Sequence, residues 1–75
     1  MNKLKRIAEI RKEKGYTQQD MSALMDLGLS TYQQKEQGVI NWLLPDLIKI
    51  RRILNVKIDD LKEVADLEKE IFGPK

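Results

Sequence analysis

The chain of 75 residues contains neither cysteine nor histidine, and these two absences exclude several classes of function. Without cysteine it can form no disulfide framework. Zinc sites and Ser-His or Cys-His catalytic arrangements need a thiolate or an imidazole, so both are excluded. Carboxylate chemistry alone would remain, and no paired acid–base or metal-binding constellation is evident in the sequence. We therefore expect no enzyme activity, no cofactor and no metal.

Long hydrophobic runs are also missing. Residues 1–15, MNKLKRIAEIRKEKG, alternate charged and apolar side chains and lack the continuous apolar stretch of a signal peptide. No segment has the length and apolar character of a membrane span. A chain of this size makes one domain, near the lower limit at which an apolar core folds unaided. The sequence thus predicts a single cytoplasmic domain over residues 1–75 with no membrane partner.

Charge is unevenly distributed although the net charge is only +2. Residues 1–14 carry six basic and two acidic side chains, a net +4, whereas residues 58–75 carry three basic and six acidic ones, a net −3. A basic surface with an acidic end fits a nucleic-acid partner. Ordinary solvated helices can show the same division, so charge alone does not decide the function.

Apolar spacing and helix-boundary signals indicate an all-α chain. A helical repeat beginning at Leu4 ends at Gly15, and Thr17 can cap a second helix with Asp20 as its capping-box acid. A third helix ends at Gly38. The segments LLPDLIKIRRIL (43–54) and IDDLKEVADLEKEIF (58–72) predict a fourth and a fifth. No stretch alternates as a strand would, so we expect no sheet.

The third helix carries neutral amides and hydroxyls where an apolar stripe would be usual. Ser30, Gln33, Gln34 and Gln37 lie at helical spacing and form one polar stripe. Such groups can enter the DNA major groove, where glutamine can pair with N6 and N7 of adenine. The same residues could instead simply solvate a surface helix.

The segments on either side of this stripe carry a resemblance to a known family. LKRIAEIRKEKGYTQQDMSALMD, LGLSTYQQKEQG and LPDLIKIRRILNVKIDDL together resemble the helix-turn-helix proteins typified by the phage Cro and CI repressors and their bacterial relatives. The similarity runs without a gap over about residues 4–62, leaving 63–75 as an extended C-terminal helix and tail. The matching positions are Arg11, Lys14–Gly15, Thr17–Gln18, Met21, Ser30–Thr31, Glu36, Gly38, Ile50, Leu54–Asn55–Val56 and Asp59 to Leu61.

The resemblance implies a five-helix, repressor-like domain whose second and third helices form the DNA-binding motif. It implies that Gln18 starts the second helix and contacts a phosphate, and that Arg11 and Glu36 form an internal ion pair. Candidate base contacts on the third helix are Leu29, Ser30, Gln33 and Gln34. Further phosphate contacts are expected from the basic side chains Lys5, Arg6 and Lys35.

Two departures from the family pattern concern the turn between the motif helices. Asp26 stands where glycine is usual, and Gly28 stands at the capping position. Aspartate tolerates a left-handed conformation and glycine can cap a helix, so the family register is preferred. In a rival register Gly28 would close the second helix and Ser30 would cap the third, with Gln33 completing a capping box.

A third departure follows Gly38, where Val39, Ile40, Asn41 and Trp42 replace the basic loop common in the family. Val39 and Trp42 could fold onto the core. Alternatively, this apolar cluster could be a contact surface. Because relatives pair through this loop and the fifth helix, the candidates for a dimer seam are Val39, Ile40, Trp42, Leu67 and Ile71.

The sequence therefore predicts a small sequence-specific transcriptional regulator, a repressor, that binds double-stranded DNA as a homodimer on a two-fold operator. The alternative is an antitoxin-like or adaptor module that keeps the fold and binds a protein through the Val39–Trp42 cluster. The amide stripe and the basic first helix favour DNA, whereas the apolar loop favours the alternative.

Overall fold

The computed structural model describes residues 4–73, and over this range the chain is helical, as the sequence predicts. Its elements are α1 (Ile7–Glu13), α2 (Gln18–Leu24), α3 (Leu29–Gln37), α4 (Leu44–Leu54), the 3₁₀ turn η1 (Ile58–Asp60) and α5 (Lys62–Phe72). Within residues 4–73 the only β-type pairing is a single isolated parallel bridge between Lys5 and Leu61. The five-helix prediction and the all-α class are thus confirmed.

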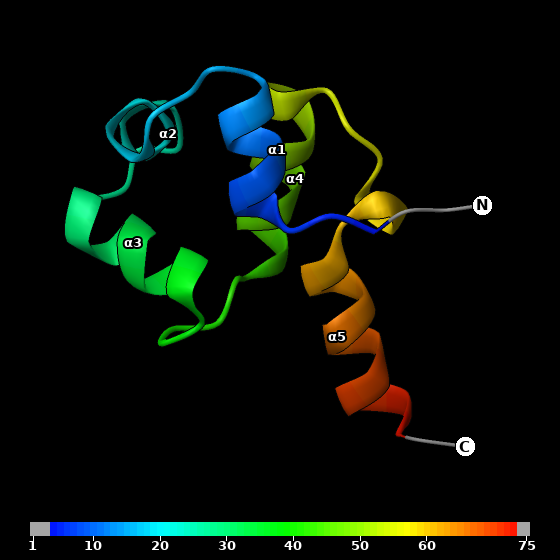
Figure 1. Ribbon diagram of the computed structural model, residues 1–75. Coiled ribbons are helices and arrows are strands. Elements are labelled where there is room, and N and C mark those ends of the chain that lie inside the picture. The colour runs from blue at the N-terminus through cyan, green and yellow to red at the C-terminus, as the bar shows by residue number, and fades with distance from the viewer. Residues whose placement is uncertain (1–3, 74–75) are drawn as a thin grey trace.

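The helices form a compact body with one projecting arm (Figure 1). Helices α1 and α4 lie at the centre, α2 and α3 lie on one side of them, and α5 lies on the other side. The far end of α5 extends away from the body. This arrangement leaves one whole flank of α3 free of other helices.

The core is built from buried apolar residues of α1 to α4, of the connections after α2 and α3, and of Leu61 just before α5. Tyr32 of α3 is fully buried at its centre, and Trp42 of the α3–α4 loop packs against it with ring centroids 5.7 Å apart in a T-shaped arrangement. An edge-to-face aromatic pair of this kind adds to the stabilisation from burial alone. The remaining buried apolar residues are Ile7, Ile10, Met21, Met25, Leu47, Ile50, Leu54 and Leu61.

Helix α5 is joined to the N-terminal segment rather than to the helix-turn-helix region. Lys5 donates its N–H to the carbonyl of Asp60 at 3.2 Å and accepts the N–H of Lys62 at 2.8 Å. The predicted fifth helix, residues 58–72, was expected to begin at Ile58. It begins instead at Lys62, because residues 58–60 form a 3₁₀ turn and Leu61 is extended, where it pairs with Lys5.

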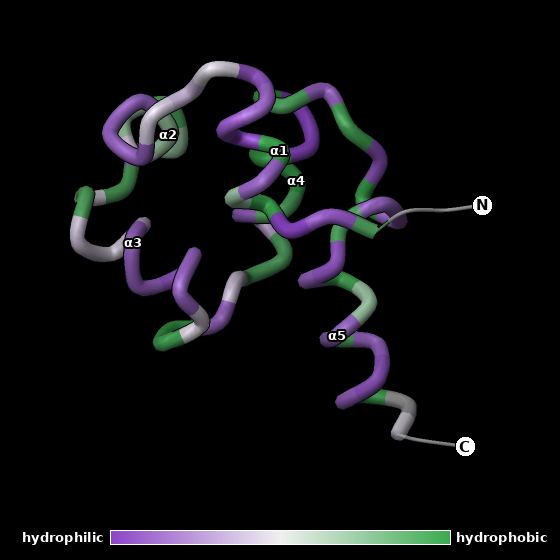
Figure 2. Tube along the Cα trace, in the orientation of Figure 1, coloured by the Kyte–Doolittle hydropathy of each residue, from purple (hydrophilic) through white to green (hydrophobic). Residues whose placement is uncertain are grey.

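The hydropathy of the trace follows this arrangement (Figure 2). Helix α3 is mostly hydrophilic along its length, whereas the loop that follows it is hydrophobic. A hydrophilic helix contributes little to a core, so α3 must be held in place by specific contacts at few positions.

Candidate nucleic-acid interface

The turn between α2 and α3 has the register that the family resemblance predicts. Gly28 is the N-cap of α3, and Asp26 adopts a left-handed conformation with φ of 58°. The N–H of Leu27 bonds to the carbonyl of Ser22 at 2.8 Å, which closes the end of α2. The rival register, in which Ser30 caps α3, is wrong, because Ser30 lies inside the helix.

Both ends of the motif are fixed by local capping. Thr17 accepts the N–H of Asp20 at 3.0 Å, and the Asp20 carboxylate accepts the N–H of Thr17 at 2.9 Å, which is a reciprocal capping box at the start of α2. At the other end Gly38 has φ of 86°, a conformation that glycine adopts without steric cost, and it ends α3. Helix α2 therefore starts at Gln18, as predicted.

The outer face of α3 is polar, as its sequence indicates. Ser30, Gln34 and Gln37 are exposed, and Gln33 is half-buried. Leu29, the first residue of the helix, is also exposed. These side chains can all reach a partner, whereas Tyr32 and Lys35 point into the body and are buried. The sequence-predicted base contacts thus lie on one accessible face of a single helix.

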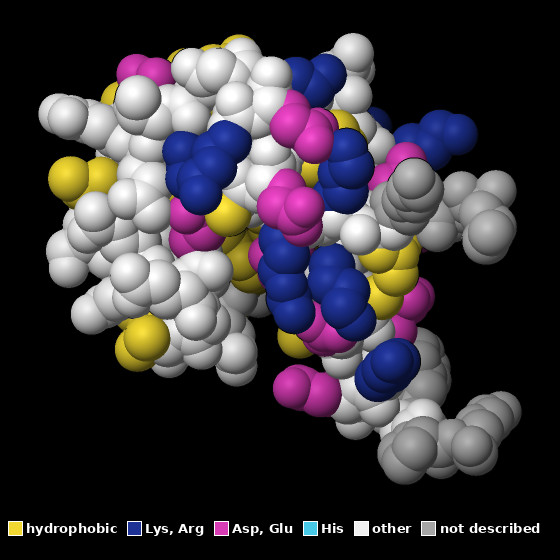
Figure 3. All heavy atoms as spheres, viewed as in Figure 1, with side chains coloured by type: hydrophobic (Ala, Val, Ile, Leu, Met, Phe, Trp, Pro, Cys, Tyr) yellow, Lys and Arg dark blue, Asp and Glu magenta, His cyan; other side chains and the backbone are white. Residues whose placement is uncertain are grey.

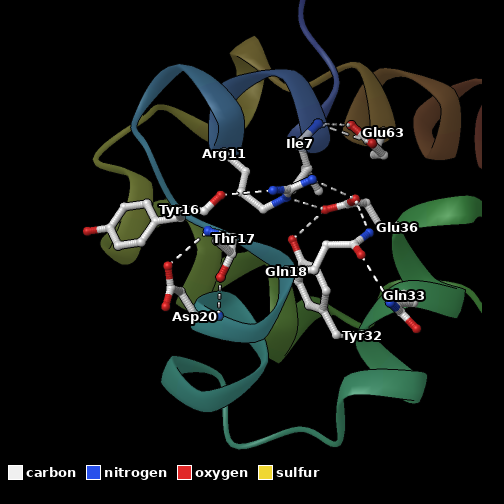
Figure 4. Close-up of polar contacts among 10 residues, drawn as sticks. All are labelled: Ile7, Arg11, Tyr16, Thr17, Gln18, Asp20, Tyr32, Gln33, Glu36 and Glu63. Atoms are coloured by element: carbon white, nitrogen blue, oxygen red, sulfur yellow. Dashed lines mark hydrogen bonds and ion pairs between the residues drawn. The ribbon is translucent and has the colours of Figure 1, made fainter.

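A buried ion pair fixes α3 to α1 (Figure 4). Arg11 donates from Nε to Glu36 Oε2 at 2.8 Å and from Nη2 to Glu36 Oε1 at 3.2 Å, and each side chain is only 7% exposed. The Tyr32 hydroxyl donates to Glu36 Oε2 at 2.7 Å, and Gln18 Nε2 donates to Glu36 Oε1 at 2.9 Å. The pair that the resemblance implies is therefore present, and it lies at the centre of a larger network.

The network determines the charge of its members. Burial opposes ionisation of Glu36, but the hydrogen bonds from Arg11, Tyr32 and Gln18 outweigh it and lower the pKa of the Glu36 carboxyl. The hydrogen bond to Glu36 raises the pKa of Arg11, although burial works against it. Burial, and then the bond to Glu36, raise the pKa of Tyr32 well above 10.0. Glu36 is consequently a carboxylate that can only accept hydrogen bonds.

Gln33 is the second amide in this network. Its Nε2 donates to Gln18 Oε1 at 3.1 Å, so that the two glutamines link the start of α2 to the middle of α3. The sequence predicted a phosphate contact for Gln18 and a base contact for Gln33, but it did not predict the bond between them. Their separation of 15 positions follows no spacing rule within one helix.

The cations predicted to contact phosphate are each paired with a carboxylate. Lys5 bonds to Glu13 at 2.7 Å and Arg6 bonds to Asp66 at 3.1 Å, both at exposed positions. Figure 3 shows basic and acidic side chains side by side over α1 and α5, while the surface over α2 and α3 is mostly neutral. The visible surface of the motif thus lacks a dense basic patch.

Lys35 requires a correction. We expected its ammonium group to reach a phosphate, but Lys35 is 7% exposed and its Nζ bonds to the carboxylate of Asp46. Asp46 also accepts the N–H of Leu43 at 3.0 Å, which caps α4. The bonds from Lys35 and Leu43 lower the pKa of Asp46 against the opposing effect of its burial. Lys35 is therefore a structural link between α3 and α4 and does not face a DNA backbone.

Trp42 is a second correction among the candidates for a dimer seam. It is 7% exposed and belongs to the core, where its Nε1 has no hydrogen-bond partner in the described residues. Leu67 is half-buried against the same core. By contrast Val39 is 70% exposed and Ile71 is 72% exposed, and Ile40 is exposed as well. Three of the five candidates are thus exposed, Leu67 is half-buried, and Trp42 is buried.

A groove of about 360 Å³ lies between the end of α3, the loop after it and α5. Ile40 and Trp42 line one side of it, and Leu67 lines the other. Its acidic residues are Glu36, Glu63, Asp66 and Glu70.

In residues 4–73 no cluster of carboxylates is arranged to hold a metal ion. None of the described helices is long and apolar enough to cross a membrane.

Comparison with protein families supports this description of the motif. A family model described as helix-turn-helix matches residues 7–61, which span α1 to η1 and end just before α5. Comparisons with curated protein sequences and with solved structures give no significant match. The matched segment contains both motif helices and the whole Arg11–Glu36 network.

Proposed function

Because this chain belongs to the helix-turn-helix family of Cro and CI repressor-like proteins, a family of DNA-binding regulators, we propose that it represses transcription by binding a two-fold operator as a homodimer. The observation that carries the proposal is the accessible polar face of α3. Leu29, Ser30 and Gln34 are exposed on a helix that the buried Arg11–Glu36 pair holds rigidly against α1. A rigid helix with outward amides and hydroxyls suits the major groove.

Specificity and affinity come from different side chains in this proposal. Gln34 has an exposed amide that can pair with N6 and N7 of adenine, and Leu29 can contact a thymine methyl group. Gln18, Lys5 and Arg6 contribute phosphate contacts, for which Lys5 and Arg6 exchange a surface carboxylate for a phosphate. Because the proposal assigns only these two cations to phosphate, we expect one monomer to bind weakly.

Dimerisation compensates for weak binding of one half-site. The exposed apolar side chains of Val39, Ile40 and Ile71 lie on the loop after α3 and on the projecting arm of α5. A two-fold contact through them would bury this apolar surface and place two copies of α3 about 34 Å apart, one turn of DNA. Each linked half-site raises the effective concentration of the other.

Selection of binding sites from random duplex DNA tests the proposal. We expect enrichment of a palindromic motif with half-sites one helical turn apart. Gln34→Ala should weaken binding to that motif by about 1–3 kcal/mol and relax one base position in each half-site. Gln37→Ala is the matched control, because Gln37 is exposed on the same helix but lies at its C-terminal end. Equal loss for selected and random DNA would contradict a reading role for Gln34.

Sedimentation and band-shift measurements on the same samples test the dimer. Ile71→Ser should lower the dimer fraction and reduce affinity for the palindrome more than affinity for random DNA. Leu24→Ser, an exposed apolar position on α2, is the control and should leave the dimer unchanged. A monomer that binds a palindrome no better than a single half-site would exclude the homodimer.

A protein-interaction module is the second candidate, and the pairing of the cations favours it. Lys5, Arg6 and Lys35, the cations that we predicted to contact phosphate, are each engaged by a carboxylate in the free chain. With Trp42 buried, the exposed apolar side chains of the Val39–Trp42 cluster are those of Val39 and Ile40. Absence of any enriched DNA sequence in the selection would favour this candidate.

A further inference from the structure

A chain of hydrogen bonds connects the buried Glu36 to the DNA-facing side of α3. Gln18 Nε2 donates to Glu36 Oε1 at 2.9 Å, and Gln33 Nε2 donates to Gln18 Oε1 at 3.1 Å. Figure 4 shows the three side chains in a row, with the amide oxygen of Gln33 pointing away from Gln18. The row runs from the ion pair with Arg11, through Gln18 of α2, to the side chain of Gln33 on α3.

The direction of every bond in this row is dictated by chemistry. Glu36 is an ionised carboxylate held by Arg11, and a carboxylate can only accept hydrogen bonds. Gln18 must therefore turn its NH₂ group toward Glu36, which leaves its oxygen to face Gln33. Gln33 must in turn place its NH₂ group against that oxygen. The group left on the outer side of Gln33 is its carbonyl oxygen.

We propose that Glu36, acting through Gln18, orients the Gln33 amide so that it presents a hydrogen-bond acceptor to the major groove and selects a base with a donor there. The bases that offer such a donor are adenine, through N6, and cytosine, through N4. Guanine and thymine present acceptors at the corresponding positions and are rejected. This inference rests on the proposed DNA-binding function and specifies one base preference within it.

Gln33 is therefore a specificity-determining residue, and Gln18 is a positioning residue for it. An amide whose rotation is fixed before binding loses less conformational entropy when it meets its base. Gln18 retains a second Nε2 hydrogen for a phosphate, so positioning Gln33 does not prevent the phosphate contact. Gln18 thereby links the contact with the DNA phosphate to the base contact of Gln33.

Gln34 provides the contrast on the same helix. It is exposed, and its side-chain amide makes no hydrogen bond to residues 4–73. Nothing in that range fixes which end of the Gln34 amide faces outward, so Gln34 can pair with donors or acceptors. Gln33 thus offers a fixed acceptor that depends on Gln18, whereas the amide of the adjacent Gln34 can offer either a donor or an acceptor.

The test is binding-site selection on random duplex DNA with the full chain and its variants. The position relaxed by Gln33→Ala identifies the base that Gln33 reads. We expect adenine or cytosine there, favoured over guanine and thymine by about fivefold or more. Gln18→Met keeps the length of the side chain without its amide, and it should reduce this preference to less than about twofold while other positions keep theirs.

Gln18→Lys provides a sharper variant because it reverses the polarity of the row. A lysine ammonium would donate both to Glu36 and to the oxygen of Gln33, which would turn the Gln33 NH₂ group outward. The preference at that one position should then shift toward guanine or thymine. Gln34→Met is the matched control and should relax a different base position without affecting the one read by Gln33.

The outcomes separate this inference from the function on which it rests. Absence of any enriched sequence for the wild type would overturn the DNA-binding proposal itself. A palindrome with guanine or thymine at the position of Gln33 would overturn the inference alone. So would a Gln18→Met protein that binds all sequences more weakly but keeps the preference, since Gln18 would then be only a phosphate contact.

A measurement without DNA tests the hydrogen bond directly. The side-chain NH₂ resonances of Gln33 should shift in Gln18→Met, and those of Gln34 should not. Circular dichroism of the same sample would establish that Gln18→Met is folded. Unchanged Gln33 resonances in the folded variant would show that the two amides are not bonded and would overturn the inference.

Discussion

The guanidinium of Arg11 and the carboxylate of Glu36 form a two-pronged ion pair although the residues are 25 positions apart. Both side chains are almost fully buried, and Arg11 also donates from Nη1 to the carbonyl of Tyr16 at 2.8 Å. The pair thus joins α1, the segment before α2, and the end of α3. This pair holds α3 in position, and Tyr32 is the only large apolar residue of α3 that is buried in the core.

Removing one partner should strand a buried charge. We expect Arg11→Ala and Glu36→Ala each to lower the free energy of unfolding by about 3–5 kcal/mol, as measured by urea denaturation. The double mutant should recover part of the loss, because neither charge is then left unpaired. Small losses that simply add would mean that the two groups do not interact.

The pair of Lys35 and Asp46 allows a test of whether Lys35 stabilises the fold or contacts a DNA phosphate. Lys35→Met should destabilise the fold by about 3–5 kcal/mol, because Asp46 loses its partner in a nearly buried site. The slope of log affinity against log salt should stay unchanged. Lys5→Met is the control with the same substitution at an exposed position, and it should reduce that slope by about 1 for each bound half-site. A reduced slope in Lys35→Met would restore Lys35 as a phosphate contact.

Trp42 should behave as a core residue with one unfavourable atom. Trp42→Ala should cost about 3–5 kcal/mol in thermal unfolding, since it leaves a cavity beside Tyr32. Trp42→Phe should change stability by less than about 1 kcal/mol, because the lost packing is offset by removal of the unpartnered Nε1–H. Sedimentation should show the same dimer fraction for Trp42→Phe as for wild type. A lower fraction at unchanged stability would place Trp42 at the seam.

Two kinds of carboxyl groups give the stability opposite responses to pH. In the folded protein the pKa of Glu36 lies below its ordinary value of 4.5, and that of Asp46 lies below 3.8. Each carboxylate therefore stabilises the fold at a pH above its ordinary pKa. This stabilisation is lost as the pH falls through the folded-state pKa. Burial raises the pKa of Glu63 above 4.5, even though its carboxylate accepts the N–H of Ile7. Its contribution is therefore greatest below pH 4.5 and is lost as pH rises through its folded-state pKa.

Glu63→Gln isolates the second response. Because glutamine is neutral and can still accept the N–H of Ile7, the variant should be more stable than wild type at pH 7, and the difference should shrink toward pH 4.5. Urea denaturation over this range measures it. Glu70→Gln is the control, since Glu70 is an exposed acid on the same helix. A difference that stays constant with pH would contradict a raised pKa at Glu63.

Local signals in the sequence were sufficient to predict the helices, whereas the turn between α2 and α3 followed from the family resemblance. The capping pair Thr17 and Asp20 and the terminal Gly38 mark their elements by residue type alone, because each bonds to its own neighbours. The start of α5 was mispredicted because the extended conformation of Leu61 comes from pairing with Lys5, a distant residue. Propensity within a segment carries no information about such a partner.

The candidate site was also predictable only in part. The outward face of α3 followed from helical spacing, since only residues on one side of a helix can be exposed together. The roles of Lys35 and Gln18 did not, because each depends on a group from another helix, Asp46 in one case and Glu36 in the other. A lysine on the surface and a lysine in a buried pair have the same sequence signal.

The bridge between Lys5 and Leu61 has a consequence for the order of folding. Together with the bond between Ile7 and Glu63, which are 56 positions apart, it closes a loop over most of the chain. Loops of this length close at a larger entropic cost than the short connections between α1, α2 and α3. We expect α5 to dock last during folding and to detach first, in a partial opening that leaves the motif intact. Native-state hydrogen exchange would show it as faster exchange at Lys62 than at Met25, and equal rates would indicate one cooperative unit.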